Sequence, residues 1–472
     1  MIKNRLIGLF AILLLTEGCV STDRSLSKEA ELAYAQSITL LSDGCQGDAE
    51  DLIEQALETY PDNKNLLFAR GVLERSRWGK REAMYFFSQV MHQFSGTAVA
   101  KAASLSLVLD QKVDAKKNLN ALTQLSDANP DNVYLLWLSA IQCREQENGP
   151  LGKARYEKLL AKFRVGPVLL HQTYANILED YLKDYETALK HRRIAVSQEA
   201  KGWSLEGLGS TLTKMEQYDE ACGVWARAVQ VAPDDSSVWG NWGWTLRKMG
   251  RYEDALEKHQ EACRLNSFSA YNQYYAGKCL EKLGRTEEMV SYYNRSAEMG
   301  YKYGQFKMGY LFHQGIGVAQ DFEKAAKWYR LAADQGHPMA WSNLGLLYGA
   351  GKGVPLDYNE QLSCYKKALK IDSNHANALN NYACLLVDCK DKTFRDYPQA
   401  VELAERSVEL DEQGYSLDTL ADAYDRNGQY DKAVKAQKRL IAFRQKKNPG
   451  KLIPQRMAER LKQYENKLTN QN

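Results

Sequence analysis

The side chains that most often perform chemistry are scattered along this sequence rather than grouped. The histidines show neither an i, i+4 pair nor the HExxH pattern of a zinc hydrolase. They lie at positions 92, 171, 191, 259, 313, 337 and 375. The segment "GAGKGV" looks like a phosphate-binding loop, but Gly353 and Val354 follow Lys352 where that loop needs Ser or Thr. The sequence therefore gives no positive evidence for catalysis, a metal site or a cofactor, and we predict structural roles for the histidines.

Cysteine is the other reactive residue type, with nine copies, of which eight remain when Cys19 is set aside. Their spacing shows no regular recurrence. Disulfides are common in exported proteins, so Cys263 with Cys279 and Cys364 with Cys384 are candidates for pairing across neighbouring helices. Buried free thiols are the alternative.

The first residues have the layout of a secretory signal. Lys3 and Arg5 precede an uncharged run from Leu6 to Leu15 that is too short to span a bilayer as a helix. The run ends in "LLTEGC", which resembles the lipobox of bacterial lipoproteins and implies that Cys19 carries a lipid anchor. A signal peptide that is cleaved without lipidation is the alternative. We therefore expect an exported protein, anchored to the outer membrane where the cell has two membranes, and otherwise periplasmic or secreted.

Composition and charge exclude several classes of protein. Ten prolines in 472 residues, with 44% hydrophobic and 26% charged residues, are typical of a folded, mostly helical chain. A net charge of +3 is far from the clustered basic excess of a nucleic-acid-binding protein. Residues 431–472 nevertheless carry twelve Lys and Arg against three acidic residues. This basic end is interpreted either as a solvated cap or as a docking element for anionic lipid or an acidic partner.

Two repeating patterns account for most of the chain. Gly209, Gly243 and Gly277 fall 34 residues apart, each followed by a turn and a small residue in a second helix. This frame resembles the tetratricopeptide repeat, a hairpin of two antiparallel helices. A second pattern recurs after 36 residues and is similar to the Sel1-like repeat, a variant of that hairpin with a longer, glycine-containing turn. Its matching residues are Gly315, Gly317, Val318 and Asp321, then Gly351, Gly353, Val354 and Asp357.

The resemblance implies an all-α fold, a right-handed α-solenoid of about a dozen stacked antiparallel helix hairpins. The stretch 98–165 is helical but keeps little of the repeat pattern. The expected order is a lipoprotein-type signal peptide (1–18), tetratricopeptide-like repeats (19–300), two Sel1-like repeats (301–372), tetratricopeptide-like repeats (373–445) and a basic C-terminal capping helix (446–472).

In stacked hairpins the first helices line a concave groove, so their exposed positions are the default binding surface. The resemblance to tetratricopeptide repeats assigns to this surface Trp203, Glu206, Trp244, Arg247, Lys248, Tyr271, Tyr274 and Lys278. Aromatic and basic residues dominate the set, which suits an anchored peptide segment. Core packing is the alternative, above all for the tryptophans.

These patterns predict a non-enzymatic interaction scaffold or adaptor of the bacterial envelope that binds a protein or peptide partner, and not nucleic acid. A carbohydrate-binding envelope lipoprotein is one alternative, because exposed aromatic side chains also bind sugars. A second alternative comes from resemblance to the cysteine-rich Sel1-like proteins, which implies disulfide-stapled repeats with penicillin-binding or hydrolase-like activity.

Overall fold

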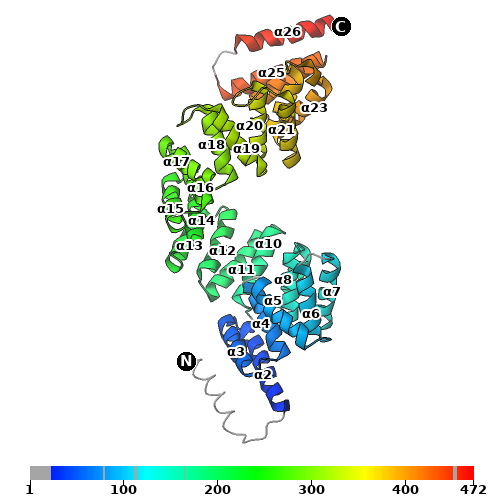
Figure 1. Ribbon diagram of the computed structural model, residues 1–472, viewed down its shortest axis with the longest axis vertical. Coiled ribbons are helices and arrows are strands. Elements are labelled where there is room, and N and C mark those ends of the chain that lie inside the picture. Colours follow the sequence, from blue (N-terminus) through cyan, green and yellow to red (C-terminus); the bar gives the residue numbers. More distant parts are fainter. Residues whose placement is uncertain (1–22, 78–79, 111–113, 164, 450–453, 472) are drawn as a thin grey trace. The chain divides into compact units, whose positions relative to one another are not determined.

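The computed structural model describes residues 23–77, 80–110, 114–163, 165–449 and 454–471. Within these ranges the chain forms α-helices and one short 3-10 helix, without any strand (Figure 1). Helices α2 to α13 and α16 to α25 pair in order as hairpins, with α14 and α15 between these two series, and a single helix, α26, follows. The predicted all-α solenoid is therefore confirmed. The chain divides into two compact units, residues 1–241 and residues 242–472.

Unit 1 contains six complete hairpins. Its helices are α2 (Asp23–Ser42), α3 (Gln46–Thr59), α4 (Lys64–Arg77), α5 (Lys80–Gln93), α6 (Ala98–Asp110), α7 (Ala115–Ala128), α8 (Val133–Glu145), α9 (Gly149–Leu160), α10 (Val168–Asp180), α11 (Tyr185–Gln198), α12 (Gly202–Lys214) and α13 (Tyr218–Val231), followed by the start of α14 (Ser236–Lys248). One hydrophobic core runs from α2 to α11.

The stretch 98–165, where the repeat pattern is weak, forms two regular hairpins, and α8 explains the weakness. Every residue from Val133 to Cys143 is buried, because α8 packs against α4 and α6 as well as against its neighbours α7 and α9. A helix enclosed on all sides is apolar all round and loses the one-sided pattern of an outer helix. The repeat is therefore obscured by burial rather than by a change of fold.

The N-terminal hairpin lies against α8 and α10 as well as against α4. The Ser37 and Tyr134 hydroxyls are 2.9 Å apart, and the Val165 amide donates to the Ser42 carbonyl at 2.9 Å. Arg75, which is almost fully buried, forms an ion pair with Glu145. These long-range contacts join α2 to α8 and to the loop before α10, and α4 to α8.

Unit 2 begins within α14 and continues as a stack of hairpins. Its further helices are α15 (Tyr252–Leu265), α16 (Ala270–Leu283), α17 (Thr286–Glu298), α18 (Lys302–Gln314), α19 (Phe322–Asp334), α20 (Pro338–Ala350), α21 (Tyr358–Ile371), α22 (Ala376–Asp388), the 3-10 helix η1 (Lys392–Phe394), α23 (Tyr397–Leu410), α24 (Gly414–Arg426), α25 (Tyr430–Lys447) and α26 (Gln455–Gln471). Each hairpin packs on the next one along the chain.

Where a first helix carries the recurring glycine, this glycine gives room to an aromatic ring of the second helix. A Cβ atom at Gly277 would lie 2.7 Å from Cδ1 of Tyr293, and one at Gly309 would lie 2.6 Å from Cδ1 of Tyr329. Both rings are completely buried. The ring follows its glycine by 16 residues in the tetratricopeptide frame and by 20 residues in the Sel1-like frame, because the Sel1-like turn is longer.

The turn residues that recur after 36 residues have specific structural roles. Asp357 caps α21, since its Oδ1 accepts from the amides of Asn359 and Glu360 at 2.8 and 3.0 Å. Gly353 has a φ of +69°, and a Cβ atom there would lie 2.2 Å from the backbone of Phe322 in the preceding hairpin. The long turns therefore lock successive hairpins together.

Candidate partner-binding surface

The eight residues assigned to the binding surface from the sequence fall in both units. Trp203 and Glu206 lie on α12 in unit 1, whereas the other six lie on α14 and α16 in unit 2. Each group is therefore described within its own unit.

In unit 1, Trp203 is 42% exposed and stands between two hollows of about 400 and 450 Å³. Glu206 lines the first hollow and accepts hydrogen bonds from Asn241 at 2.8 Å and from Ser237 at 3.3 Å. Burial, and then the negative charge of Asp235, raise the pKa of Glu206. Leu169 borders both hollows. Trp203 is thus accessible and is not a core side chain.

A buried charge network lies at the edge of the first hollow. Glu179, which is 2% exposed, pairs with Arg192 at 3.1 Å and with Lys214 at 2.6 Å. Burial raises the pKa of Glu179, but Arg192 and the hydrogen bonds from Lys214 and Thr211 outweigh burial and lower it overall. Because the buried Glu179 carboxylate is held by both cations and by the Thr211 hydroxyl, we assign this network a structural role.

In unit 2, tyrosines of α16 and α18 form a continuous aromatic cluster. Tyr274 lies at its centre, with ring centroids 5.1 Å from Tyr275, 5.4 Å from Tyr301 and 5.9 Å from Tyr303. Tyr271 contacts Tyr275 at 4.4 Å. Tyr271 and Tyr303 are about 40% exposed. Ring-to-ring contacts restrain these side chains, so they present a rigid aromatic surface.

Cationic side chains surround the tyrosines. The Arg247 guanidinium lies 5.0 Å from the ring centroid of Tyr275, and the Lys248 ammonium lies 5.1 Å from that of Trp244. Arg247 Nε is buried and has no hydrogen-bond partner within the part of the chain that the structure describes. We call the set Trp244, Arg247, Lys248, Tyr271, Tyr274, Tyr275, Lys278, Tyr301, Tyr303 and Lys307 the tyrosine-lysine surface.

One carboxylate, Glu281, lies among these cations and is already shared. It accepts from the Tyr293 hydroxyl at 2.6 Å and from Lys307 at 2.9 Å, and it lies 3.6 Å from Lys278. Burial, followed by the positive charge of Lys307, lowers the pKa of Lys278, and Arg247 adds to this effect. The surface therefore has more positive charge than Glu281 can neutralise.

The structure adds Tyr275, Tyr301, Tyr303 and Lys307 to the residues assigned from the sequence. The tetratricopeptide positions were carried over only as far as α16, where the repeat type changes. The signal was available, because Gly277 and Gly309 align the two first helices and place Tyr303 where Tyr271 stands. Whether any of these residues binds a partner stays a prediction.

Histidines and cysteines have structural surroundings. His337 and His375 cap α20 and α22, each accepting from a backbone amide through Nδ1. His259 is fully buried, and burial lowers its pKa to about 4. His171 and His191 contact each other through Nδ1 atoms 2.8 Å apart. Across the described ranges, no group of three or more His, Cys, Asp or Glu side chains is placed to hold a metal ion.

The eight cysteines from Cys45 to Cys389 are free thiols in the structure. Neither candidate pair, Cys263 with Cys279 or Cys364 with Cys384, forms a disulfide. Burial raises the pKa of Cys279 to about 11 and that of Cys364 to about 12, so these thiols are protonated at neutral pH. The disulfide-stapled alternative thus has no support in the described residues. Cys19 and the leader lie outside those residues.

The C-terminal helix α26 packs on α25 and directs part of its charge inward. Arg460 binds Asp418 at 2.7 Å and also pairs with Asp422, while Lys467 binds Asp425 at 2.7 Å. These three aspartates form one face of α24. Helix α26 therefore caps the last hairpin, and part of its basic charge is neutralised within unit 2.

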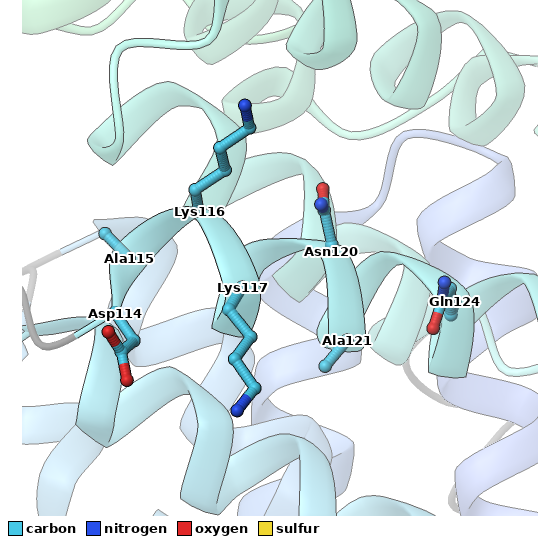
Figure 2. A pocket seen from close by; sticks show the side chains of 7 residues that line it. All are labelled: Asp114, Ala115, Lys116, Lys117, Asn120, Ala121 and Gln124. Atoms are coloured by element: carbon cyan, nitrogen blue, oxygen red, sulfur yellow. The ribbon is translucent and has the colours of Figure 1, made fainter.

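A hollow of about 720 Å³ lies along α7 (Figure 2). Its side chains all come from α7 or its N-cap, and Figure 2 shows them side by side along that single helix. Those labelled are Asp114, Ala115, Lys116, Lys117, Asn120, Ala121 and Gln124. Since no second element supplies a converging group, this hollow is open surface rather than a site.

Among the helices that the structure describes, none combines the length and the apolar character required to cross a bilayer. The Sel1 repeat family matches residues 302–337, 339–371 and 376–412. Its third match covers the unit with an insertion near η1, which the sequence analysis assigned to the tetratricopeptide type. Tetratricopeptide repeat families match residues 241–300 and 415–447.

Similar proteins cover the chain unevenly. DnaJ homolog subfamily C member 7 is 25% identical over 124 residues in Mus musculus and 26% identical over 119 residues in Homo sapiens. The alignment spans about a quarter of the length of these relatives.

Two solved structures are similar. The protective antigen c5321 of uropathogenic Escherichia coli, described as an SLR fold, has 16% identity and a TM-score of 0.47, covering 92% of this chain and 99% of that one. A Sel1 repeat protein from Oxalobacter formigenes has 24% identity and a TM-score of 0.35, covering 43% of this chain and 85% of that one. With the repeat frames and the hairpins described above, the family matches identify the chain as a helical-repeat protein that combines tetratricopeptide and Sel1-like repeats.

Proposed function

We propose that the protein is a non-enzymatic adaptor of the bacterial envelope whose tyrosine-lysine surface binds an acidic segment of a partner protein. The observation that carries this proposal is the excess of cations over carboxylates around a rigid aromatic cluster. Helical-repeat solenoids are suited to such a role because their first helices offer extended binding surfaces.

Charge complementarity supports an acidic partner. Arg247 forms no ion pair with any described residue, and Glu281 is shared by Lys278, Lys307 and the Tyr293 hydroxyl. A carboxylate that reached Arg247 would satisfy its buried Nε and reduce the repulsion between Arg247 and Lys278. Charge-assisted hydrogen bonds of this kind are stronger than those between neutral groups.

The tyrosines support a protein segment with apolar side chains next to its acids. Tyr271 and Tyr303 are partly exposed and held by neighbouring rings, so binding costs little side-chain entropy at these positions. Rigid aromatic side chains of this kind are typical anchors in protein interfaces.

Binding can be tested by selecting random peptides on the purified protein. We expect acidic residues beside apolar ones to be enriched, and binding to weaken with added salt. Replacing the peptide acids by their amides, or introducing Arg247→Glu with Lys278→Glu, should weaken binding at least about tenfold. Lys327→Glu, on the exposed outer helix α19, is the matched control and should leave binding unchanged. Selection of peptides without acids, or equal binding by the double variant, would contradict the proposal.

The envelope location rests on the leader, in which Lys3, Arg5 and the apolar run precede Cys19. Lipidation is tested by metabolic labelling with a radioactive fatty acid. Wild type should incorporate the label and fractionate with membranes, and Cys19→Ser should lose both properties. A mature N-terminus with an unmodified Cys19 would rule out lipidation.

A second candidate function, carbohydrate binding, is favoured by the surroundings of Trp203 alone. The hollow beside its indole ring is also lined by Asn176 and Asn241, which are partly exposed, and a flat ring beside polar side chains suits the apolar face and hydroxyl edge of a sugar. A glycan array compared between wild type and Trp203→Ala distinguishes this function from peptide binding, because Trp203 is not part of the tyrosine-lysine surface.

A further inference from the structure

Helices α25 and α26 leave a groove open between them. It has a volume of about 580 Å³. Its lining is Lys438, Ile441, Ala442 and Gln445 from α25, and Ala458, Leu461, Lys462 and Glu465 from α26. Both sets have the spacing i, i+3, i+4, i+7, which is one face of a helix, so the groove follows both helices. Earlier outer helices of unit 2, such as α23, pack against the hairpin that follows them, whereas no further hairpin is described after α26.

The α2–α3 hairpin has a corresponding ridge. Leu32, Ala35 and Thr39 lie on one face of α2 and are exposed, Leu32 to 48%. Glu29 and Glu31, also exposed, border this ridge. A ridge of small and apolar side chains on one helix is the shape that packs between two other helices.

The two ends have opposite charge. Residues 28–62 contain nine acidic residues and one lysine, whereas residues 431–472 contain twelve basic and three acidic residues. Within the described residues, several of these charges have no ion pair. They are Asp48, Asp51 and Glu58 on α3, Arg444 and Lys446 on α25, and Arg456 and Lys462 on α26.

We propose that α2 of one copy packs into the α25–α26 groove of a second copy, so that copies of the chain associate head to tail. The ridge at Leu32 would cover the apolar lining, and Glu29 and Glu31 would approach Lys438 and Lys462. Terminal hairpins of a soluble repeat array need polar outer faces unless another element covers them. Because ridge and groove are different surfaces, the contact is heterologous and leaves one of each open for further copies. This association goes beyond the proposed function and uses other residues.

Sedimentation velocity on the full-length chain carrying Cys19→Ser tests the association. We expect the mass to increase with protein concentration at about 50 mM salt and to return to that of a monomer at about 500 mM, where charges are screened over a few ångströms. Monomers at every concentration and salt would overturn the proposal.

Charge reversal identifies the two surfaces. A groove variant, Lys438→Glu with Lys462→Glu, and a ridge variant, Glu29→Lys with Glu31→Lys, should each associate at least about tenfold more weakly. Mixing the two variants should restore association, because opposite charges then face each other in both pairings. Lys435→Glu, 76% exposed on α25 and outside the groove lining, is the matched control and should behave as wild type. Circular dichroism should show full helicity in all variants, and a mixture that stays monomeric would refute the pairing.

Two further outcomes would give other roles to the acidic α2–α3 hairpin and the basic α25–α26 segment. A monomer that binds vesicles containing phosphatidylglycerol through the basic end, and loses this binding in the groove variant, would make that end a membrane contact. In a mixture of isotopically light and heavy protein, crosslinks from α2 to α26 should join the two forms. Crosslinks that join residues of the same copy alone would overturn the proposal in favour of closure within one chain.

Discussion

The contact between the recurring glycine of a first helix and the aromatic ring of the second helix can be tested by making the same substitution at two sites of one hairpin. At Gly209, on α12, a Cβ atom would lie 2.7 Å from Cε2 of Trp225, a ring that is 1% exposed. At Gly223, on the outer face of α13, a Cβ atom would meet nothing within 4 Å. Gly→Ala should therefore destabilise the hairpin at the first position and stabilise it at the second.

The magnitudes follow from two opposing effects. At either position, alanine stabilises the interior of a helix by about 0.5–1 kcal/mol relative to glycine. Overpacking a filled core costs about 1–3 kcal/mol, and Trp225 is too rigid and too enclosed to move away cheaply. We expect Gly209→Ala to lose about 1–2 kcal/mol and Gly223→Ala to gain about 0.5–1 kcal/mol.

Hydrogen exchange of the α12 and α13 amides measures the effect locally, which suits a long repeat array that does not unfold in one step. Protection of these amides should fall in Gly209→Ala and rise in Gly223→Ala, while the amides of α25 serve as an internal reference. Equal or greater protection in Gly209→Ala would refute the argument that the ring excludes a Cβ atom.

Two other predictions concern pH and capping. Burial lowers the pKa of His259 to about 4, whereas the pKa of histidine in an unfolded chain is near 6.5. The neutral ring therefore contributes its full stability above about pH 6.5, and this stability is lost as the pH falls toward 4. As the pH is lowered from about 7.5 to about 5, the urea concentration at the unfolding midpoint should fall for wild type and should fall less for His259→Phe. An equal fall in both proteins would contradict this. Asp357→Ala should lower the stability of α21 by about 1 kcal/mol because it removes the N-terminal cap, and Asp357→Asn is the control that keeps most of the capping. Hydrogen exchange at the start of α21 measures the effect. Unchanged protection in the alanine variant would show that the cap is dispensable.

Sequence spacing was sufficient where a repeat position has one structural role. The glycines at 209, 243 and 277 predicted hairpins because only a residue without a side chain fits beneath the ring of the second helix. The same reasoning failed at α8, whose residues are buried on every side. Its enclosure depends on contacts with α4, which lies far away in the sequence, and a periodic pattern does not encode such contacts.

The candidate site illustrates the same difference. Trp203 and Tyr271, assigned from first-helix positions, are accessible in the structure, but such positions carry no information on how charges are shared. Glu281 is shared by Lys307 and Tyr293, and Arg247 has no ion pair among the described residues. These facts depend on side chains from four helices. An electrostatic argument about partners therefore needed the structure.

The two units differ in what their inner helices can offer to a partner. In unit 1, α8 packs against α4 and α6, the N-terminal hairpin contacts α8, and Trp203 borders two hollows. In unit 2, α16 and α18 keep exposed tyrosines and lysines, and the packing that obscured the repeat at α8 does not occur there. The first hairpins of the described chain mainly pack against one another, whereas the later hairpins expose rigid rings and cations that no carboxylate neutralises. These features suit unit 2 to the proposed partner binding. The separate positions of the tyrosine-lysine surface and of the α25–α26 groove would then allow one copy to bind a partner while it contacts a second copy.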